Sequence, residues 1–343
     1  MESRTRIPKN GEAFFCREST ASRGKATVSV VTSLFNSARY VEEFYQRILA
    51  QLQKINCDYE VVFVDDGSPD QSLDVALEIA QRDPKVCVVE LSRNFGHHKA
   101  LMTGLEMAKG ELVFLIDVDL EEPPEVLTLF YQKLRECSAD VIFGVQQQRQ
   151  GPWYQRISGE AFYLLYNRLS STPIPRNQLR ARLMTRPYVD ALLQHREQLF
   201  MIEVLCNLTG FKQIPFPMNK TGYKGTTSYT LARRFRLFIN GITMSSSRPL
   251  ICIGYLGSFI TMLAALYMTV TLFQYIFHGT SVDGWTSLII SIWFLGGLTI
   301  FSLGIIAVYL SVMFQEVKQR PYRIIKRVHT GGQVPAESLV ERS

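Results

Sequence analysis

Two long stretches of this sequence contain no charged side chain, and they limit what the chain can fold into. No Asp, Glu, Lys or Arg occurs in residues 249–282 or 284–315, and Asp283 alone separates the two stretches. A helix that crosses a bilayer needs about 20 mostly apolar residues, and both stretches are longer than that. We therefore predict two transmembrane helices, roughly at 251–277 and 285–314. The alternative is a pair of buried core helices, but such helices would need a much larger protein around them.

Basic residues flank both predicted helices. Between Glu203 and Asp283 the chain has no acidic residue, whereas Lys and Arg recur before the first stretch and again after the second. The short connection at 278–284 contains neither Lys nor Arg. The positive-inside rule then places both termini and the large N-terminal part in the cytoplasm. We expect a multi-pass protein of the inner (cytoplasmic) membrane. The basic residues suit an anionic lipid surface, although solvated faces without a target give the same pattern.

The overall composition excludes several other classes of protein. Of the 343 residues, 47% are hydrophobic and 20% are charged, which is typical of a globular chain and excludes intrinsic disorder. Only 6 Cys and 22 Gly are present, which excludes a disulfide scaffold and a collagen-like fibre. The basic flanks explain the formal net charge of +6, so this charge does not indicate nucleic-acid binding.

The residues before the apolar stretches alternate between strand and helix patterns. We predict strands at 28–34, 60–64, 86–91 and 112–116, and helices at 40–52, 72–81 and 98–108. This alternation indicates an α/β fold with a mostly parallel, Rossmann-like sheet, in which ligands bind at the carboxyl ends of the strands.

Acidic residues follow two of the predicted strands. Asp117 and Asp119 come directly after 112–116, and residues 65–68 (Asp-Asp-Gly-Ser) follow 60–64. Two carboxylates one residue apart suit a hard divalent cation, which bridges the phosphates of a nucleotide. Either motif alone also fits an ordinary polar turn. Two acidic strand ends in one α/β unit favour a nucleotide-plus-metal site. The neighbouring pair at 97–98 (His-His) is a weaker metal candidate, because adjacent side chains of a helix point apart.

Three ordered blocks of the sequence resemble those of a known enzyme family. Successive blocks of glycosyltransferase family 2 are similar to residues 61–68 (VVFVDDGS), 91–96 (LSRNFG) and 117–125 (DVDLEEPPE). The resemblance is greatest to the polyprenyl-phosphate glycosyltransferase branch and runs from about residue 28 into the two apolar stretches. It implies a GT-A fold, a nucleotide-diphosphate sugar donor, Mg²⁺ or Mn²⁺, and a polyprenyl (undecaprenyl or dolichyl) phosphate acceptor.

The resemblance also implies roles on the donor side of the site. Asp117 and Asp119 correspond to the residues that face the metal and the diphosphate, so they are the predicted catalytic residues. Glu121 stands where the family usually has a metal-contacting Gln, and it completes the predicted metal set. Asp65 would hold the base or ribose of the nucleotide, with Asp66 beside it.

The opening loop of the family, Pro-x-Tyr-Asn-Glu, corresponds to residues 33–37 (SLFNS). Only Asn36 is retained there, and Phe35 keeps an aromatic ring. Together with Asp117, the nucleotide-binding residues predicted from this loop are Ser33, Phe35, Asn36 and Ser37.

Several further residues resemble the positions that grip the acceptor phosphate, a task suited to the planar donors of Arg. The predicted acceptor-binding residues are Arg149, Arg156, Ser158, Arg180, Lys220 and Lys224. For Arg149 and Arg156 the alternative is a solvated loop and helix face. The two lysines flank Gly222, which stands where the family has an Arg.

Arg180 occupies a position where several relatives have an Asp, a candidate general base. A phosphate monoester has a second pKa of about 6 and is already largely ionised near pH 7, so it needs positioning more than deprotonation. We therefore expect an inverting, in-line displacement by a lipid phosphate, which gives a polyprenyl-phosphate sugar for cell-envelope glycans. The alternatives are transfer to a glycolipid or saccharide hydroxyl, or a non-catalytic scaffold that binds nucleotide sugars.

These inferences divide the chain into five parts. We expect a flexible tail at 1–26, a cytoplasmic GT-A domain at 27–228, an amphipathic juxtamembrane region at 229–248, the two transmembrane helices within 249–315, and a basic cytoplasmic tail at 316–343. The region 229–248 fits a helix at the bilayer surface and a core helix equally well. Small residues in the second apolar stretch suit either homo-oligomer formation or packing within the hairpin.

Overall fold

The computed structural model describes residues 27–146, 177–220, 248–278 and 284–331. Several predictions lie outside these residues. They are the N-terminal tail, the amphipathic region before Arg248, and the four acceptor-binding candidates Arg149, Arg156, Ser158 and Lys224.

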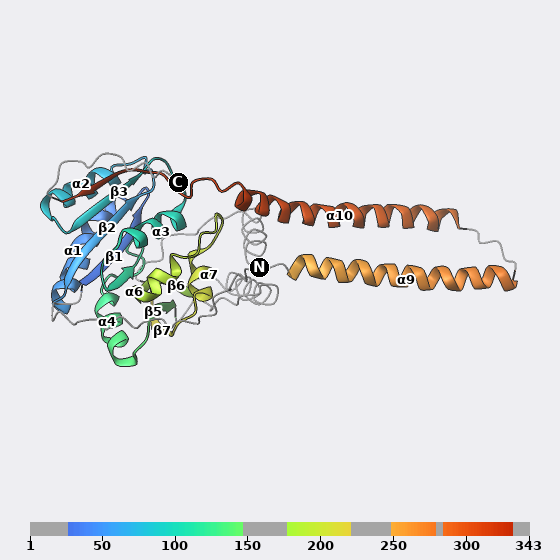
Figure 1. The fold of residues 1–343 in the computed structure, drawn as a ribbon, viewed down its shortest axis with the longest axis horizontal. Helices are drawn as coiled ribbons and strands as arrows, with labels where there is room; N and C mark the ends of the chain where they lie inside the picture. The colour runs from blue at the N-terminus through green and yellow to red at the C-terminus, as the bar shows by residue number, and fades with distance from the viewer. Residues whose placement is uncertain (1–26, 147–176, 221–247, 279–283, 332–343) are drawn as a thin grey trace, which may run out of the picture.

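A single sheet of eight strands forms the centre of the described globular part (Figure 1). The strand order is β7-β5-β6-β4-β1-β2-β3-β8. The strands are β1 (Thr27–Leu34), β2 (Asp58–Asp65), β3 (Val86–Leu91), β4 (Leu112–Leu115), β5 (Val141–Gln146), β6 (Gln178–Thr185), β7 (Gln213–Met218) and β8 (Ile325–Thr330). The block β4-β1-β2-β3 is parallel, as is the pair β5–β7, whereas β6 and β8 run antiparallel to their neighbours. The predicted α/β fold with a mostly parallel, GT-A-like sheet is confirmed.

Helices cover both faces of this sheet. On one face α1 (Ala38–Ile55), α2 (Ser72–Arg82) and α4 (Val126–Cys137) pack on side chains such as Val30 and Phe63. On the other face α3 (His97–Met107), α6 (Arg186–Leu192) and α7 (Ile202–Leu208) pack on the alternate residues, such as Val31 and Val64. Successive strand residues point to opposite faces, which is why the central parallel strands bury apolar side chains on both faces.

The topology brings four loops together at one edge of the sheet. The strands β1, β2, β3 and β4 are parallel, so their carboxyl ends and the residues that follow lie side by side. Gly67 makes the closest of these approaches, because a Cβ there would lie 2.7 Å from the backbone carbon of Arg93 and from the backbone nitrogen of Asn94. Its φ of +65° also favours glycine. The loops after β2 and β3 therefore pack closely against each other at this edge of the sheet.

The segment predicted as a basic C-terminal tail contains a strand instead. Residues of β8 pair antiparallel with the outer edge of β3, with Val89 opposite Val328. Ile325 and Val328 pack against the core, while Lys326 and Arg327 are exposed. The prediction of a tail for this part of 316–343 was wrong, because the strand has only two apolar residues and its partner edge is formed by a distant part of the chain.

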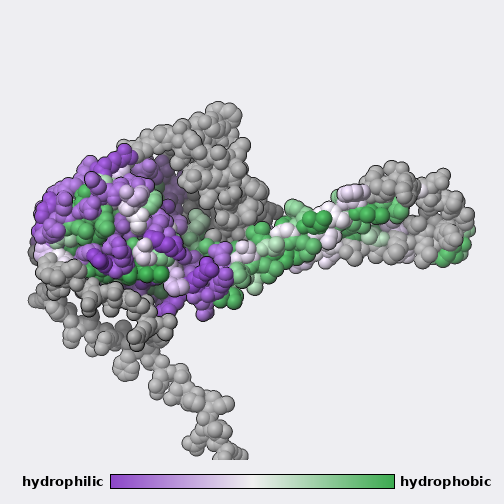
Figure 2. All heavy atoms as spheres, turned by 90° about the horizontal axis from the view of Figure 1, so that it is seen from above, coloured by the Kyte–Doolittle hydropathy of each residue, from purple (hydrophilic) through white to green (hydrophobic). Residues whose placement is uncertain are grey.

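Two long helices extend beside each other away from the sheet (Figure 1). They are α9 (Arg248–His278) and α10 (Trp285–Val317), which contain the two uncharged stretches. Apolar residues gather along this arm, whereas polar residues prevail on the globular part (Figure 2). Within the described residues, one stretch, Ser291–Val317, is long and apolar enough to cross a membrane, and none of it is buried inside the protein. The α10 stretch is therefore not a core helix. The second span and the membrane hairpin stay predictions.

Candidate active site

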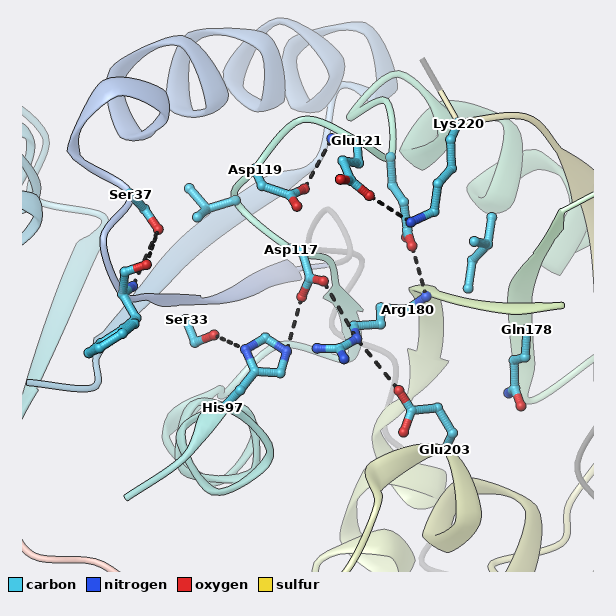
Figure 3. A pocket seen from close by; sticks show the side chains of 14 residues that line it. Ser33, Ser37, His97, Asp117, Asp119, Glu121, Gln178, Arg180, Glu203 and Lys220 are labelled. Carbon is cyan, nitrogen blue, oxygen red and sulfur yellow. Dashed lines mark hydrogen bonds and ion pairs between the residues drawn. The ribbon is translucent and has the colours of Figure 1, made fainter. Parts of the chain in front are cut away.

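A cavity of about 500 Å³ lies at the edge of the sheet where the carboxyl ends of β1 and β4 meet (Figure 3). Its walls come from the ends of β1 and β4, the first turn of α3, strand β6, helix α7 and the chain just after β7. The lining residues are Ser33, Phe35, Ser37, His97, Asp117, Val118, Asp119, Glu121, Glu122, Gln178, Leu179, Arg180, Glu203 and Lys220.

Asp117 lies at the centre of this cavity, two residues beyond the end of β4 (Figure 3). His97 Nε2 is 3.2 Å from Asp117 Oδ1, and Arg180 Nε is 3.5 Å from Asp117 Oδ2. Burial raises the pKa of Asp117 to about 7, and the nearby Glu122, Asp119 and Glu203 add to the rise, whereas Arg180 opposes it. An additional positive charge near Asp117 would stabilise its ionised form and lower its pKa.

His97 connects Asp117 to the end of β1. A hydrogen bond of 2.8 Å joins its Nδ1 to the hydroxyl oxygen of Ser33. Burial, together with the positive charge of Arg180, lowers the pKa of His97 to about 3, so the imidazole is neutral. The sequence favoured a structural role over a metal-binding one for this histidine. In the structure His97 lines the cavity and contacts Asp117.

Arg180 and Glu203 form a partly buried ion pair beside Asp117. Arg180 projects from β6, and its Nε lies 3.5 Å from Glu203 Oε1, the same distance that separates it from Asp117. Burial lowers the pKa of Arg180, but Asp117, Glu203 and Glu122 together raise it above its ordinary value. Burial raises the pKa of Glu203, but the charges of Arg180, His98 and Arg182 and a backbone hydrogen bond together outweigh burial and lower the pKa. Both groups are therefore ionised, and one guanidinium serves two carboxylates.

Glu122 fixes the position of Arg180 through the backbone. Its side chain accepts the backbone N–H of Arg180 at 3.1 Å and that of Ala181 at 2.6 Å. Glu122 is only 4% exposed, so these bonds are shielded from water. They tie β6 to the loop that follows β4, and that loop carries Asp117. The buried hydrogen bonds of Glu122 therefore help to set the distance between Asp117 and Arg180.

The third carboxylate of the predicted metal set has a basic partner. Glu121 Oε2 lies 2.7 Å from Lys220 Nζ, while the backbone N–H of Glu121 donates to Asp119 Oδ1 at 3.0 Å. Leu120 adopts φ of +60°, and this left-handed residue makes the tight turn between the two acids. No three His, Cys, Asp or Glu side chains of the described residues converge as a metal site.

Asp117 and Asp119 nevertheless fit a divalent cation. Both supply carboxylate oxygens, the ligands that Mg²⁺ and Mn²⁺ prefer, and both line the cavity. Asp117 Oδ1 is buried and has no hydrogen-bond partner of good geometry among the described residues. This oxygen retains its lone pairs for a cation, while the phosphates of a nucleotide and water would complete the ligand set.

The predicted nucleotide-binding residues occupy two places. Ser33, Phe35 and Ser37 line the cavity, and Asn36 lies beside them, where its backbone N–H donates to Ser68 Oγ at 3.2 Å. Asp65 lies at the next strand end and does not line the cavity. Its carboxylate accepts the Ser68 N–H at 3.3 Å.

Asp66 also lies outside the cavity lining. It accepts the N–H of Phe95 at 2.7 Å and of Gly96 at 3.0 Å, which joins the loops after β2 and β3. Burial raises the pKa of both Asp65 and Asp66, and the backbone N–H groups that they accept oppose the rise. In this structure both carboxylates hold the loops around the cavity.

Sequence reasoning missed two acidic residues of the cavity, and it did not place a third residue, His97, in the site. Glu122 belongs to the block DVDLEEPPE, but nothing in the sequence distinguishes its buried carboxylate from that of Glu121. Glu203 lies on a short helix without any motif, and His97 belongs to a pair with an unfavourable helical spacing. Only the folded sheet brings these side chains to Asp117.

Comparison with known proteins yields close relatives over most of the chain. The profile described as Glycosyl transferase family 2 matches residues 29–194. A Mycobacterium tuberculosis protein named "Putative glycosyltransferases" is 45% identical over 302 residues, which is 88% of each chain. The "Prophage bactoprenol glucosyl transferase homolog" of Escherichia coli K12 is 32% identical, with 88% of this chain and 99% of that protein covered. Among solved structures, a mannosyltransferase from Pyrobaculum calidifontis in complex with GDP-Man and Mn²⁺ is 16% identical, covers 87% of this chain and 88% of its own, and has a TM-score of 0.47.

Proposed function

The chain belongs to glycosyltransferase family 2, and we propose that it is a membrane-anchored enzyme that moves a sugar from a nucleotide-diphosphate donor to a polyprenyl phosphate. The observation that carries this proposal is the pairing of the acidic centre Asp117 with the partly buried guanidinium of Arg180 in one cavity. Relatives named for bactoprenol glucosyl transfer support the choice of acceptor, since the chain covers 99% of their length at 31–32% identity.

The donor half of the site lies on the side of β1 and β4. Asp117 and Asp119 would hold Mg²⁺ or Mn²⁺, with Glu121 as a third ligand if Lys220 releases it. The bound cation would neutralise the diphosphate leaving group. The loop that contains Ser33, Phe35, Asn36 and Ser37 would contact the nucleotide, and so would the next strand end with Asp65 and Asp66.

The acceptor half lies on the side of β6 and β7. Arg180 and Lys220 line the cavity there, and both carry charges that suit a phosphate dianion. Arg149, Arg156, Ser158 and Lys224 belong to the same proposed set. No general base is needed, since the phosphate is already ionised. One of its oxygens attacks the anomeric carbon, the bond from that carbon to the diphosphate breaks, and an α-linked donor gives a β-linked product.

The two long helices would anchor this site to the membrane. We place α9 and α10 as a transmembrane hairpin of the inner membrane, with both chain ends and the GT-A domain (27–228) in the cytoplasm. The region 229–248 would lie at the bilayer surface. The lipid acceptor then reaches the cavity from the same membrane, and the product would serve cell-envelope glycan synthesis. Small residues of α10 would allow a homo-oligomer.

An assay on membranes that contain the full chain tests this function. Radiolabelled nucleotide sugars are supplied one at a time, with undecaprenyl phosphate and with Mg²⁺, Mn²⁺ or EDTA. We expect one donor to give a metal-dependent lipid product whose sugar is released by mild acid, because a glycosyl phosphodiester is acid-labile. Asp119→Asn should abolish this product, whereas Asp58→Asn, an exposed carboxylate paired with Lys85, should not. A product that survives mild acid indicates a hydroxyl acceptor. If no donor gives any product, the chain is not this enzyme.

A further inference from the structure

The loop before α7, residues 198–200, contacts the end of α10 and the residues that follow it. Glu316 lies in the last turn of α10, and its carboxylate accepts the backbone N–H of Gln198 at 2.9 Å and of Leu199 at 3.1 Å. Further along, the ring of Tyr322 stacks on Phe200, with centroids 5.8 Å apart and an interplanar angle of 11°. Residues 198–200 are therefore attached to the end of α10 and to the segment that leads from it to β8. We call residues 316–324 the connector.

The connector is itself fixed to the sheet. The backbone N–H of Ser92, just after β3, donates to the carbonyl of Ile324 at 2.9 Å. Arg323 pairs with Glu106 of α3, and β8 continues the sheet directly after the connector. Since the end of the connector next to β8 is anchored to the sheet, its contacts with the loop restrict the position of that loop.

The same loop leads directly into the cavity. Phe200 lies against His98, with ring centroids 6.2 Å apart, and the backbone N–H of Ile202 faces His98 Nδ1 at 3.5 Å. Ile202 begins α7, and the next residue, Glu203, lines the cavity. The place where α7 starts therefore determines where the Glu203 carboxylate lies.

Glu203 holds Arg180 loosely. Arg180 Nε is 3.5 Å from both Glu203 Oε1 and Asp117 Oδ2, which is longer than a charge-assisted hydrogen bond of about 2.8 Å. The guanidinium is thus placed by charge between two carboxylates. A bound phosphate would form shorter bonds with it, so its affinity depends on where Glu203 keeps the guanidinium.

From these contacts we infer that Glu203 and Glu316 are positioning residues for Arg180. The connector ties the end of the apolar helix α10 to the guanidinium that would meet the acceptor phosphate. This inference rests on the proposed function. It implies that damage to the connector weakens binding of the lipid phosphate and leaves binding of the nucleotide sugar intact.

Steady-state kinetics of the full chain in detergent micelles test the inference. Glu316→Gln removes the negative charge from the contact with the loop, and we expect the KM for polyprenyl phosphate to rise about three- to tenfold. The KM for the donor should change less than about twofold. Lys326→Gln is the matched control, because Lys326 pairs with Glu90 on β3 and does not contact the loop. This control should leave both constants unchanged.

Two further variants separate positioning from a general loss of structure. Tyr322→Leu removes the stacked ring and should raise the acceptor KM, whereas Tyr322→Phe keeps the ring and should restore it. Because Glu203 and Glu316 act along one route, the double variant Glu203→Gln/Glu316→Gln should have nearly the acceptor KM of Glu203→Gln alone.

Each outcome decides the matter. If Glu316→Gln matches the control, or changes both substrates equally, Glu316 is not a positioning residue. Independent, multiplicative effects of the two glutamate variants also overturn the inference. If Glu316→Gln does not fold, the pair Tyr322→Leu and Tyr322→Phe gives the same comparison with the Glu316 contacts intact. Failure of the proposed function looks different, because the unsubstituted chain would then form no lipid product at all.

Discussion

The buried contact made by Glu122 allows a prediction of magnitude. Its carboxylate accepts two backbone N–H groups, those of Arg180 and Ala181, and the side chain is 4% exposed. Glu122→Ala leaves both donors buried without an acceptor, and each unsatisfied donor costs about 1–3 kcal/mol. We expect a loss of about 2–6 kcal/mol in the free energy of unfolding. For a domain of this size, 1 kcal/mol corresponds to about 2–4 °C in melting temperature.

Glu122→Gln separates the two hydrogen bonds. The amide retains one acceptor oxygen but presents its NH₂ group to the second donor, so we expect roughly half the loss seen with alanine. Thermal unfolding of the full chain in detergent, followed by tryptophan fluorescence and by circular dichroism, measures both changes. Glu43→Ala is the control, because Glu43 is exposed on α1 and its ion pair with Arg47 contributes little.

The Glu122 contact should also affect activity. Since Glu122 ties β6 to the loop that carries Asp117, its loss should raise the acceptor KM in samples kept well below their melting temperature. If the free energy of unfolding of Glu122→Ala is within about 1 kcal/mol of that of the Glu43→Ala control, the two N–H groups must find water or another acceptor. The contact would then not fix β6, and the reasoning would be refuted.

Three further predictions concern other parts of the domain. Burial would raise the pKa of Asp83, but two tyrosine hydroxyls and a backbone N–H that it accepts lower the pKa below its ordinary value of 3.8. Asp83 therefore stabilises the fold above that value, and urea titrations from pH 5 to pH 2 should show the stabilisation disappearing with acid, with a flatter profile for Asp83→Asn. Gly67→Ala should lower the melting temperature by several degrees, because its Cβ would lie 2.7 Å from the backbone of Arg93 and φ is +65°. Arg180→Asp removes the positive charge between Asp117 and Glu203 and adds a third carboxylate there. Lipid-product assays should show at least about a tenfold loss of kcat/KM for the acceptor, with a smaller loss for Arg180→Lys.

The sequence predicted the parts of the fold that depend on local pattern. The strands β1 to β4 and the helices between them are apolar runs and amphipathic turns, and their bounds lie close to the predicted ones. The strands β5 to β7 were not predicted. Strand β5 is an apolar run like the earlier strands and was overlooked, whereas β6 contains two arginines and β7 two prolines, which obscure the strand pattern. Strand β8 was taken for a tail, since a short basic segment becomes a strand only when the free edge of β3 is available to it.

The site divides in the same way. Carboxylates at strand ends are visible in the sequence, because apolar strands mark where the loops begin, and Asp117 and Asp119 indeed line the cavity. Their charge partners are not visible. Arg180 was proposed because its charge suits a phosphate dianion, but Glu203 reaches it from a helix whose first residues contact the connector through the preceding loop. Contacts between distant elements carry no local signal, so they emerge only from the folded chain.

The charge arrangement of the cavity bears on how two anionic substrates share one site. Asp117 contacts Arg180, and Glu121 contacts Lys220, so two carboxylates of the predicted metal set already have basic partners from the other half of the cavity. A divalent cation bound between the carboxylates would compete with Lys220 for Glu121 and with Arg180 for Asp117. Lys220 would then lose its contact with Glu121, and Arg180 would keep its contact with Glu203. Positive charge on the acceptor side would then be least compensated once the donor and its cation are in place. Because a phosphate dianion binds best where positive charge lacks a partner, we expect the donor to bind first and to prepare the site for the lipid. Glu203, which we infer to be positioned through Glu316, would keep Arg180 in place through that exchange.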